Sequence, residues 1–209
     1  MTHVNEPFSQ ALFDGISAEA TVGYLGIVTP DGYPRVVPVN FATIGTQVYF
    51  HGAAHGEKHG VLAGGPRVTV AIVVPYAMIP SYWRSPDYAC PATQYYKSIL
   101  IRGRGAIVHE PDEKATALQA LMEKHQPEGG FGRLDSADPL YRKGIDDVAI
   151  FRIDPDRIDI RTKFGENLTR ETRLRIIEKL RECNQGRDAD TTLEMEKRLD
   201  ATRESKEPK

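Results

Sequence analysis

The sequence is short of cysteine and has no long apolar run. Cys90 and Cys183 are its two cysteines, too few for a disulfide framework, which favours a reducing compartment. The longest apolar stretch, residues 68–80, is shorter than the run of about 20 residues that a membrane-spanning helix needs. The first ten residues lack the basic and apolar segments of a signal peptide. We therefore expect a cytoplasmic protein that does not contact membranes.

The sequence also lacks an excess of charge of one sign and the short motifs of several enzyme classes. Its 27 Lys and Arg face 29 Asp and Glu, a net charge of −2, so the basic surface typical of nucleic-acid-binding proteins is not expected. It has no Gly-x-Ser-x-Gly turn, no Walker lysine loop, no Cys-x-x-Cys pair and no dinucleotide-binding glycine fingerprint. Redox chemistry in such a chain would depend on a bound cofactor.

What the sequence does contain is a series of short β-type runs separated by turn residues. The first two runs flank a Pro-Asp-Gly turn, so they should pair as an antiparallel hairpin. No crossover helix separates the first three runs, which disfavours a parallel sheet. Six strands are predicted: residues 23–29, 35–41, 46–51, 68–74, 98–108 and 148–160, the last broken at Asp154-Pro155-Asp156. A small antiparallel barrel would hide the edges of these strands, so we expect a mainly β fold.

Helices are predicted at residues 57–63 and 112–125, and a charge-dense segment follows the strands. From Arg161 onward, 24 of 49 residues are charged. Thr169 suits the N-cap of a helix there, and a second helix is expected at about residues 191–201. The apolar stripe of the first tail helix consists of Leu174, Ile177 and Leu180, with Ile176. We expect two parts, a barrel domain over residues 1–165 and a charged helical extension over residues 166–209.

Residues 49–66 are the most informative segment for function. A strand ends at His51, a glycine-spaced loop follows, and a short helix begins near Lys58. Glycines that permit close approach, free N–H groups and a lysine suit a phosphate. An ordinary strand–loop–helix corner with a solvated lysine explains the same residues. Arg35, after the hairpin turn, is either a second cation for the same anion or a solvated side chain.

A second interpretation of this segment is that its histidines are metal ligands. His51, His55 and His59 are four residues apart, which would align them on one helix face. The glycines at positions 52, 56 and 60 argue against a helix through all three. Glu57 is the remaining local ligand candidate, without the spacing of a known metal motif. We therefore expect no metal site here.

Three segments carry a likeness to a known family. They are DGYPRVVPVNF, VYFHGAAHGEKHGVLAGGPRVTVAIV and YYKSILIRGRGAIVHEPDEKATALQAL. In this order they resemble the pyridoxamine 5′-phosphate oxidase-like FMN-binding split barrels, and within them the nitroimidazole-resistance-like branch. The resemblance covers residues 24–160. It implies a six-stranded antiparallel split β-barrel, with the helical tail added at its C-terminus.

The resemblance also implies a flavin site. Arg35 matches a phosphate-contacting arginine, and Lys58 matches the second of a basic pair that binds the 5′-phosphate, with Glu57 in place of the first. His51 and Gly52 match a pair that lines the flavin, and His51 is our candidate catalytic residue. Ser98 matches a position where oxidases carry a flavin-contacting glutamine. The strand that runs along the ring consists of Arg35, Val36, Val37, Pro38, Val39 and Asn40.

The resemblance finally implies an activity and a partner. Family members form homodimers in which each flavin lies in the interface, so we expect a homodimer with two FMN sites. The expected function is an oxidoreductase that passes electrons from NAD(P)H through FMN to a small acceptor such as a nitroaromatic compound. The Trp and Arg-x-His pattern of true pyridoxamine phosphate oxidases is missing, because the corresponding stretch reads FRIDPDRIDIRTKFGENL. A flavin-binding regulator without turnover, or the same barrel with F420 or haem, is the alternative.

Overall fold

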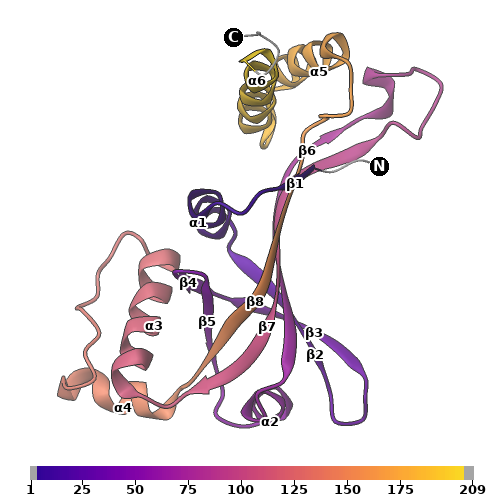
Figure 1. Cartoon of the computed structure of the whole chain (residues 1–209). Coiled ribbons are helices and arrows are strands. Elements are labelled where there is room, and N and C mark those ends of the chain that lie inside the picture. Colours follow the sequence, from indigo (N-terminus) through magenta and orange to yellow (C-terminus); the bar gives the residue numbers. More distant parts are fainter. Residues whose placement is uncertain (1–3, 205–209) are drawn as a thin grey trace. The chain divides into compact units, whose positions relative to one another are not determined.

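The computed structural model describes residues 4–204 (Figure 1), and the element bounds below refer to this part of the chain. The strands are β1 (Val4–Glu6), β2 (Val22–Val28), β3 (Pro34–Asn40), β4 (Ala42–Ile44), β5 (Gln47–Gly52), β6 (Arg67–Ile79), β7 (Thr93–Val108) and β8 (Ala149–Lys163). The helices are α1 (Gln10–Glu19), α2 (Glu57–Ala63), the 3-10 helix η1 (Ser81–Trp83), α3 (Pro111–His125), α4 (Pro139–Asp147), α5 (Arg170–Cys183) and α6 (Asp188–Glu204).

All strands belong to one sheet, in the order β3-β2-β6-β7-β8-β5-β4, with β1 beside β8. The predicted hairpin is confirmed, because β2 and β3 pair antiparallel from Val22–Asn40 to Val28–Pro34. Gly32 in its turn has φ +85°, a conformation that favours glycine. Strand β3 also contacts β5, so this part of the sheet curls toward closure. The fold is the expected mainly β, antiparallel split barrel with added helices.

The described chain divides into two compact units. Residues 7–73 and 99–160 form the barrel unit, and residues 4–6, 74–98 and 161–204 form the tail unit. Strands β6, β7 and β8 run through both. The expected boundary between residues 165 and 166 therefore differs from the division by contacts, and independent folding of residues 1–165 stays a prediction.

The strand count corrects the expectation of six, because the described residues form eight strands. The two additional strands, β1 and β4, are only three residues long, too short for a sequence periodicity to show. Strand β8 is continuous through Asp154-Pro155-Asp156, where a break was predicted. A proline removes one backbone donor but leaves the extended conformation allowed, so the strand continues past it.

Two glycines of β7 allow its close approach to neighbouring chain segments. A Cβ atom at Gly103 would lie 2.1 Å from the carbonyl oxygen of Asp154 on β8. A Cβ atom at Gly105 would lie 2.4 Å from a methyl carbon of Leu62 on α2. The sequence predicts a bulge or barrel bend at these glycines, and the structure shows that their immediate role is to leave room for backbone and core.

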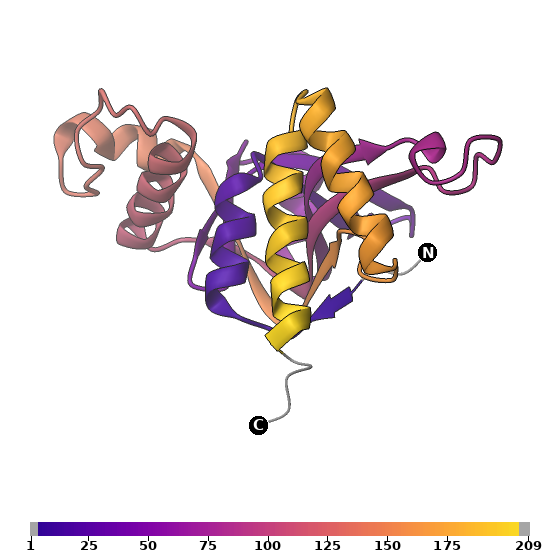
Figure 2. The same ribbon diagram turned by 90° about the horizontal axis from the view of Figure 1, so that it is seen from above.

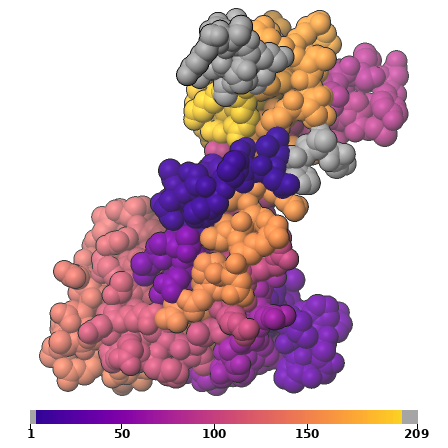
Figure 3. Space-filling model, in the orientation of Figure 1, coloured from indigo at the N-terminus to yellow at the C-terminus, as the bar shows by residue number. Residues whose placement is uncertain are grey.

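In the barrel unit, α3 contacts β4, β5 and α4 (Figure 1). Figure 3 shows the surface of this part of the chain in pink to salmon. Pro111 occupies its first turn with Asp112 and Glu113, and basic residues occupy its last turn, as the helix dipole favours. Ala117 of this helix belongs to a buried cluster with Tyr49, Val108 and Ile150. Helices α1 and α4 were not predicted from the sequence.

In the tail unit, α5 and α6 lie side by side (Figure 2). The predicted cap is confirmed, because Thr169 Oγ1 accepts a hydrogen bond from the Thr172 N–H at 3.2 Å. The predicted stripe is corrected at one position: Leu174 is 41% exposed, whereas Ile177 and Leu180 are buried, as is Ile176. Helix α6 begins at Asp188, ahead of the expected start.

Two further sequence expectations can be compared with these elements. None of the described helices is both long and apolar enough to cross a membrane. Cys90 and Cys183 are free and exposed.

Candidate functional site

The candidate site lies in the barrel unit, where the start of β3, the end of β5 and the start of α2 meet. The Arg35 guanidinium donates a hydrogen bond to the Glu57 carboxylate, which links β3 to α2. Both side chains are substantially exposed, at 53% and 42%. The residue that replaces a basic one in the family pattern therefore engages the arginine that was expected to bind phosphate.

Lys58 is the half-buried cation of the site. Its Nζ lies 5.3 Å and 5.2 Å from the ring centroids of Phe50 and Phe151, which stack on each other. Burial lowers the pKa of Lys58 because removal from water disfavours its charged form. Within residues 4–204, no carboxylate forms an ion pair with it. An unpaired ammonium at a partly dehydrated position is a suitable partner for an anionic ligand.

Gly52 is needed for this position of Lys58. A Cβ atom at Gly52 would lie 2.7 Å from Lys58 Nζ, so any side chain there would displace the amine. Gly52 and Phe50 are two residues apart on β5 and face the same side of the sheet. The predicted close approach of a ligand to Gly52 stays a prediction; in the structure the space beside this glycine holds the Lys58 amine.

His51 points to the other side of β5. Successive strand residues face opposite sides of a sheet, so His51 lies opposite Phe50 and Gly52 and away from Lys58. Its side chain is exposed, and its backbone pairs with that of Ile150 on β8. The structure thus does not bring His51 and Lys58 together on one face, and a contact of His51 with a cofactor stays a prediction.

The expected ring-binding strand, β3, presents two different faces. One face carries Arg35, Val37 and Val39. Their partners on β2, which are Ile27, Leu25 and Gly23, are all buried. The opposite face consists of Val36, Pro38 and Asn40, all exposed. Strand β3 stands at one end of the strand order, so Pro38 interrupts no ladder on its outer side. This exposed face is open to a planar ligand or to a second chain.

A cavity of about 350 Å³ opens beside Arg35. Arg67 at the start of β6 and Arg102 on β7 also line it, with Asp156 as its one carboxylate. Arg102 pairs with Asp159 at 3.4 Å, and Arg67 has no ion pair within the described residues. Neither Arg67 nor Arg102 was predicted from the sequence. The glycine–proline stop before Arg67 and the glycine after Arg102 were the available signals.

The remaining predicted residues lie elsewhere. Ser98 is half-buried on β7 and belongs to the tail unit. His55 is exposed in the loop before α2, and the His59 ring packs edge-on against Phe151 at 6.1 Å. No group of three potential metal-ligating side chains occurs in the part of the chain that the structure describes.

The geometry of this site fits a phosphate-bearing flavin in three respects and opposes it in one. Lys58 supplies an unpaired cation, and Arg35 and Arg67 line a cationic cavity nearby. The exposed face of β3 offers apolar area for a flat ring. Glu57 opposes an anion, because it places a carboxylate on Arg35. Arg35 keeps further N–H donors beside that pair, so it can contact both groups.

The comparisons with known proteins support the same family. The family described as pyridoxamine 5′-phosphate oxidase matches residues 13–162. A search of curated proteins found no match. Among solved structures, a protein assigned to 5-nitroimidazole antibiotic resistance from Bacteroides thetaiotaomicron is 20% identical, with a TM-score of 0.60 over 77% of this chain and 87% of its own.

Two further solved structures are similar to this chain. The flavocytochrome Anf3 from Azotobacter vinelandii is 18% identical, with a TM-score of 0.62 over 76% of this chain and 69% of its own. A FAD and haem binding protein from Mycobacterium smegmatis is 19% identical, with a TM-score of 0.61 over 76% and 73%. At these identities the likeness establishes a shared fold.

Proposed function

Because the chain belongs to the pyridoxamine 5′-phosphate oxidase family, we propose that it is a flavoprotein that binds FMN at the candidate site. The observation that carries the proposal is Lys58, a half-buried ammonium that lacks a carboxylate partner and lies against Gly52. In this proposal Lys58 and Arg35 hold the phosphate, and the exposed face of β3 supports the ring. Two similar solved structures, one named a flavocytochrome and one a FAD and haem binding protein, support a redox cofactor of this kind.

We propose that the protein is an oxidoreductase that uses NAD(P)H and a small acceptor such as a nitroaromatic compound. A bound flavin supplies hydride acceptance and electron transfer, whereas the protein supplies binding and orientation. The likeness to a structure named for nitroimidazole resistance supports this acceptor class. His51, exposed at the end of β5, is the residue we propose for hydrogen bonding to the bound ring or substrate.

The proposed partner is a second copy of this chain. Tyr24 and Val28 on β2 and Val36 on β3 project from one side of the hairpin and are 46%, 59% and 67% exposed. Exposed apolar groups that gather on one sheet face mark interaction surfaces. Because the same face includes Val36, Pro38 and Asn40, a partner chain there would also enclose a ring bound to β3.

The tail helices give no support to the alternative of a DNA-binding regulator. Several of their cations are paired with acidic residues of the same helix, as in Lys179–Glu182 at 2.7 Å on α5 and Lys197–Glu194 at 3.2 Å on α6. Cations that are already paired leave little positive field for phosphate groups of nucleic acid. We therefore propose a small-molecule substrate and no nucleic-acid partner.

The test is a cofactor and turnover assay on the full chain. Mass spectrometry of the cofactor released from the purified protein distinguishes FMN from FAD, F420 and haem. Anaerobic addition of NADH or NADPH should bleach the flavin absorbance, and a nitroaromatic acceptor should restore it. If the protein neither carries nor takes up FMN, the proposal is wrong. If it binds FMN but NADH and NADPH do not reduce the flavin, the protein is a flavin-binding module and not an oxidoreductase.

A further inference from the structure

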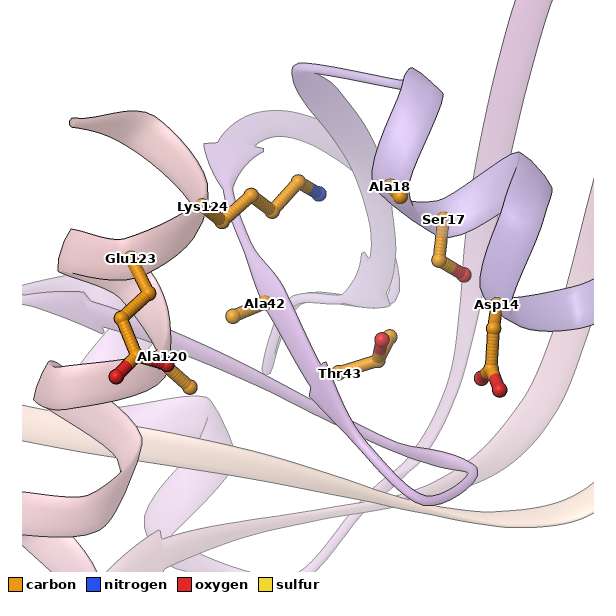
Figure 4. A pocket seen from close by; sticks show the side chains of 8 residues that line it. All are labelled: Asp14, Ser17, Ala18, Ala42, Thr43, Ala120, Glu123 and Lys124. Atoms are coloured by element: carbon orange, nitrogen blue, oxygen red, sulfur yellow. The ribbon is translucent and has the colours of Figure 1, made fainter. Parts of the chain in front are cut away.

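A second cavity of the barrel unit shares no residue with the candidate flavin site. It lies between α1, β4 and α3 and has a volume of about 520 Å³ (Figure 4). Its lining consists of Asp14, Ser17, Ala18, Ala42, Thr43, Ala120, Glu123 and Lys124. The three alanines leave space between the helices, and the polar groups come from all three elements.

Two polar atoms in this lining are buried without a hydrogen-bond partner. They are Lys124 Nζ on α3 and Ser17 Oγ on α1. Ser17 is 1% exposed, and Lys124 Nζ lies 3.3 Å from the ring centroid of Phe41. Lys124 extends from α3 toward α1, where Ser17 lies (Figure 4). A buried donor that lacks an acceptor destabilises a protein, so a ligand that accepts from both groups would be stabilised here.

The two carboxylates of the lining do not neutralise Lys124. Asp14 accepts a hydrogen bond from Gln10 Nε2 at 2.8 Å, and Glu123 accepts one from Gln119 Nε2 at 2.8 Å. Both residues are exposed, and both carboxylates point away from the Lys124 amine (Figure 4). They therefore form a solvated acidic rim, whereas the Lys124 amine is buried over the Phe41 ring without a hydrogen-bond partner.

We propose that this cavity binds a small organic monocarboxylate. One carboxylate oxygen accepts a hydrogen bond from Lys124 Nζ and the other accepts one from Ser17 Oγ. The apolar body of the ligand packs against Ala18, Ala42 and Ala120. A dianion such as inorganic phosphate fits less well, because the cavity offers one cation and has two carboxylates at its rim.

Binding should weaken in mildly alkaline solution. Burial lowers the pKa of Lys124 to about 8, so the charged form predominates at pH 7 and is lost as the pH rises through that value. The other charged groups that face the cavity are Asp14 from α1 and Glu123 from α3, and β4 contributes only Ala42 and Thr43. Loss of the Lys124 charge should make binding about tenfold weaker at pH 9 than at pH 7.

The test is calorimetric titration of the full chain with sodium benzoate at pH 7. Lys124→Met should weaken benzoate binding at least about tenfold, and Ser17→Ala should weaken it to a smaller extent. Lys143→Met removes an exposed lysine of α4 and serves as the matched control with unchanged binding. Thermal melting and FMN titration of each variant show that the fold and the flavin site are intact.

Several outcomes would overturn the inference. These are an absence of benzoate binding to the wild type, equal binding by wild type and Lys124→Met, and tighter binding of inorganic phosphate than of benzoate. Because the two sites share no residue, a negative benzoate result would not contradict the proposed FMN binding. Equally, an absence of FMN binding in the wild type would not contradict the proposed carboxylate site.

Discussion

At the scale of single residues, Lys58 has a partly buried charge that would be stabilised by an anionic ligand. Its ammonium lies over two aromatic rings without a carboxylate partner, and burial lowers its pKa. A phosphate beside it would offset that cost, because the charge would then be paired. Lys58→Ala should weaken FMN binding about tenfold to a hundredfold, the equivalent of one charge-assisted contact worth roughly 1.5–3 kcal/mol. Flavin fluorescence quenching measures this, with Lys143→Ala as the control. An unchanged dissociation constant would indicate that Arg35 and Arg67, and not Lys58, bind the phosphate.

Glu57 should weaken FMN binding, whereas Lys58 should strengthen it. It is bonded to Arg35 and would repel an incoming phosphate, so its neutralisation frees the guanidinium. Because exposed ion pairs are worth about 0–1 kcal/mol, Glu57→Gln should tighten FMN binding by about two- to fivefold. The same titration measures the change, and Glu128→Gln, in an exposed loop, is the control. Weaker binding in Glu57→Gln would mean that the Arg35–Glu57 pair orders the site for the ligand.

At the scale of elements, the contact between β7 and β8 depends on a missing side chain. Gly103→Ala would place its Cβ atom against the Asp154 carbonyl, and backbone rather than a flexible side chain would have to move. Overpacking costs about 1–3 kcal/mol, and we expect the upper end of that range in urea unfolding. Gly15→Ala on α1, with open space around the glycine, should instead stabilise the protein slightly. Equal stabilities of the two variants would show that the strands can separate at no cost.

The helix pair of the tail unit offers a matched test of its apolar face. Leu180 is fully buried on α5, whereas Leu174 on the same helix is 41% exposed. Leu180→Ala should lower the free energy of unfolding by about 2–5 kcal/mol, and Leu174→Ala by less than about 0.5 kcal/mol. Urea denaturation of both variants measures the difference. Similar losses would restore the stripe as the sequence predicted it.

The contrast between these two leucines shows which features of a helix its sequence predicts and which it does not. Periodicity predicts that α5 has an apolar stripe, but it does not predict which end another helix covers. Strands of six or more residues and glycine-bounded helices were predictable, because their patterns are local. The three-residue strand β1 forms by pairing with the distant β8, which no local pattern encodes. Strand β4 pairs with its neighbour β5, but three residues are too few for a periodicity to show.

The candidate site was predictable to a similar degree. The strand Arg35–Asn40, Gly52 and Lys58 follow from the family pattern, and the structure brings Gly52 and Lys58 together. The pairing of Arg35 with Glu57 and the side of β5 that His51 occupies are tertiary facts. The second cavity could not be predicted either, because Ser17 and Lys124 come from helices far apart in the sequence.

At the scale of the whole molecule, assembly and cofactor binding should be linked. The exposed face of the β2–β3 hairpin carries Tyr24, Val28 and Val36, and the same strand β3 supports the proposed ring site. A ligand that binds an assembled pair better than a single chain stabilises the pair by mass action. FMN should therefore shift the monomer–dimer equilibrium toward the dimer.

Val36→Asp tests this link at the centre of that face. Val36 is 67% exposed, so the change should leave the monomer folded, but it would bury a charge in the proposed interface. An unpaired charge buried there costs several kcal/mol, about 3–5 by analogy with broken buried pairs, which is enough to dissociate a dimer at micromolar concentration. Sedimentation velocity should show a dimeric wild type and a monomeric Val36→Asp, with weaker FMN binding in the variant. Leu140→Asp, on an exposed α4 residue, should remain dimeric and bind FMN normally. A dimeric Val36→Asp would assign the interface to another surface, and a monomeric variant with unchanged FMN affinity would separate flavin binding from assembly.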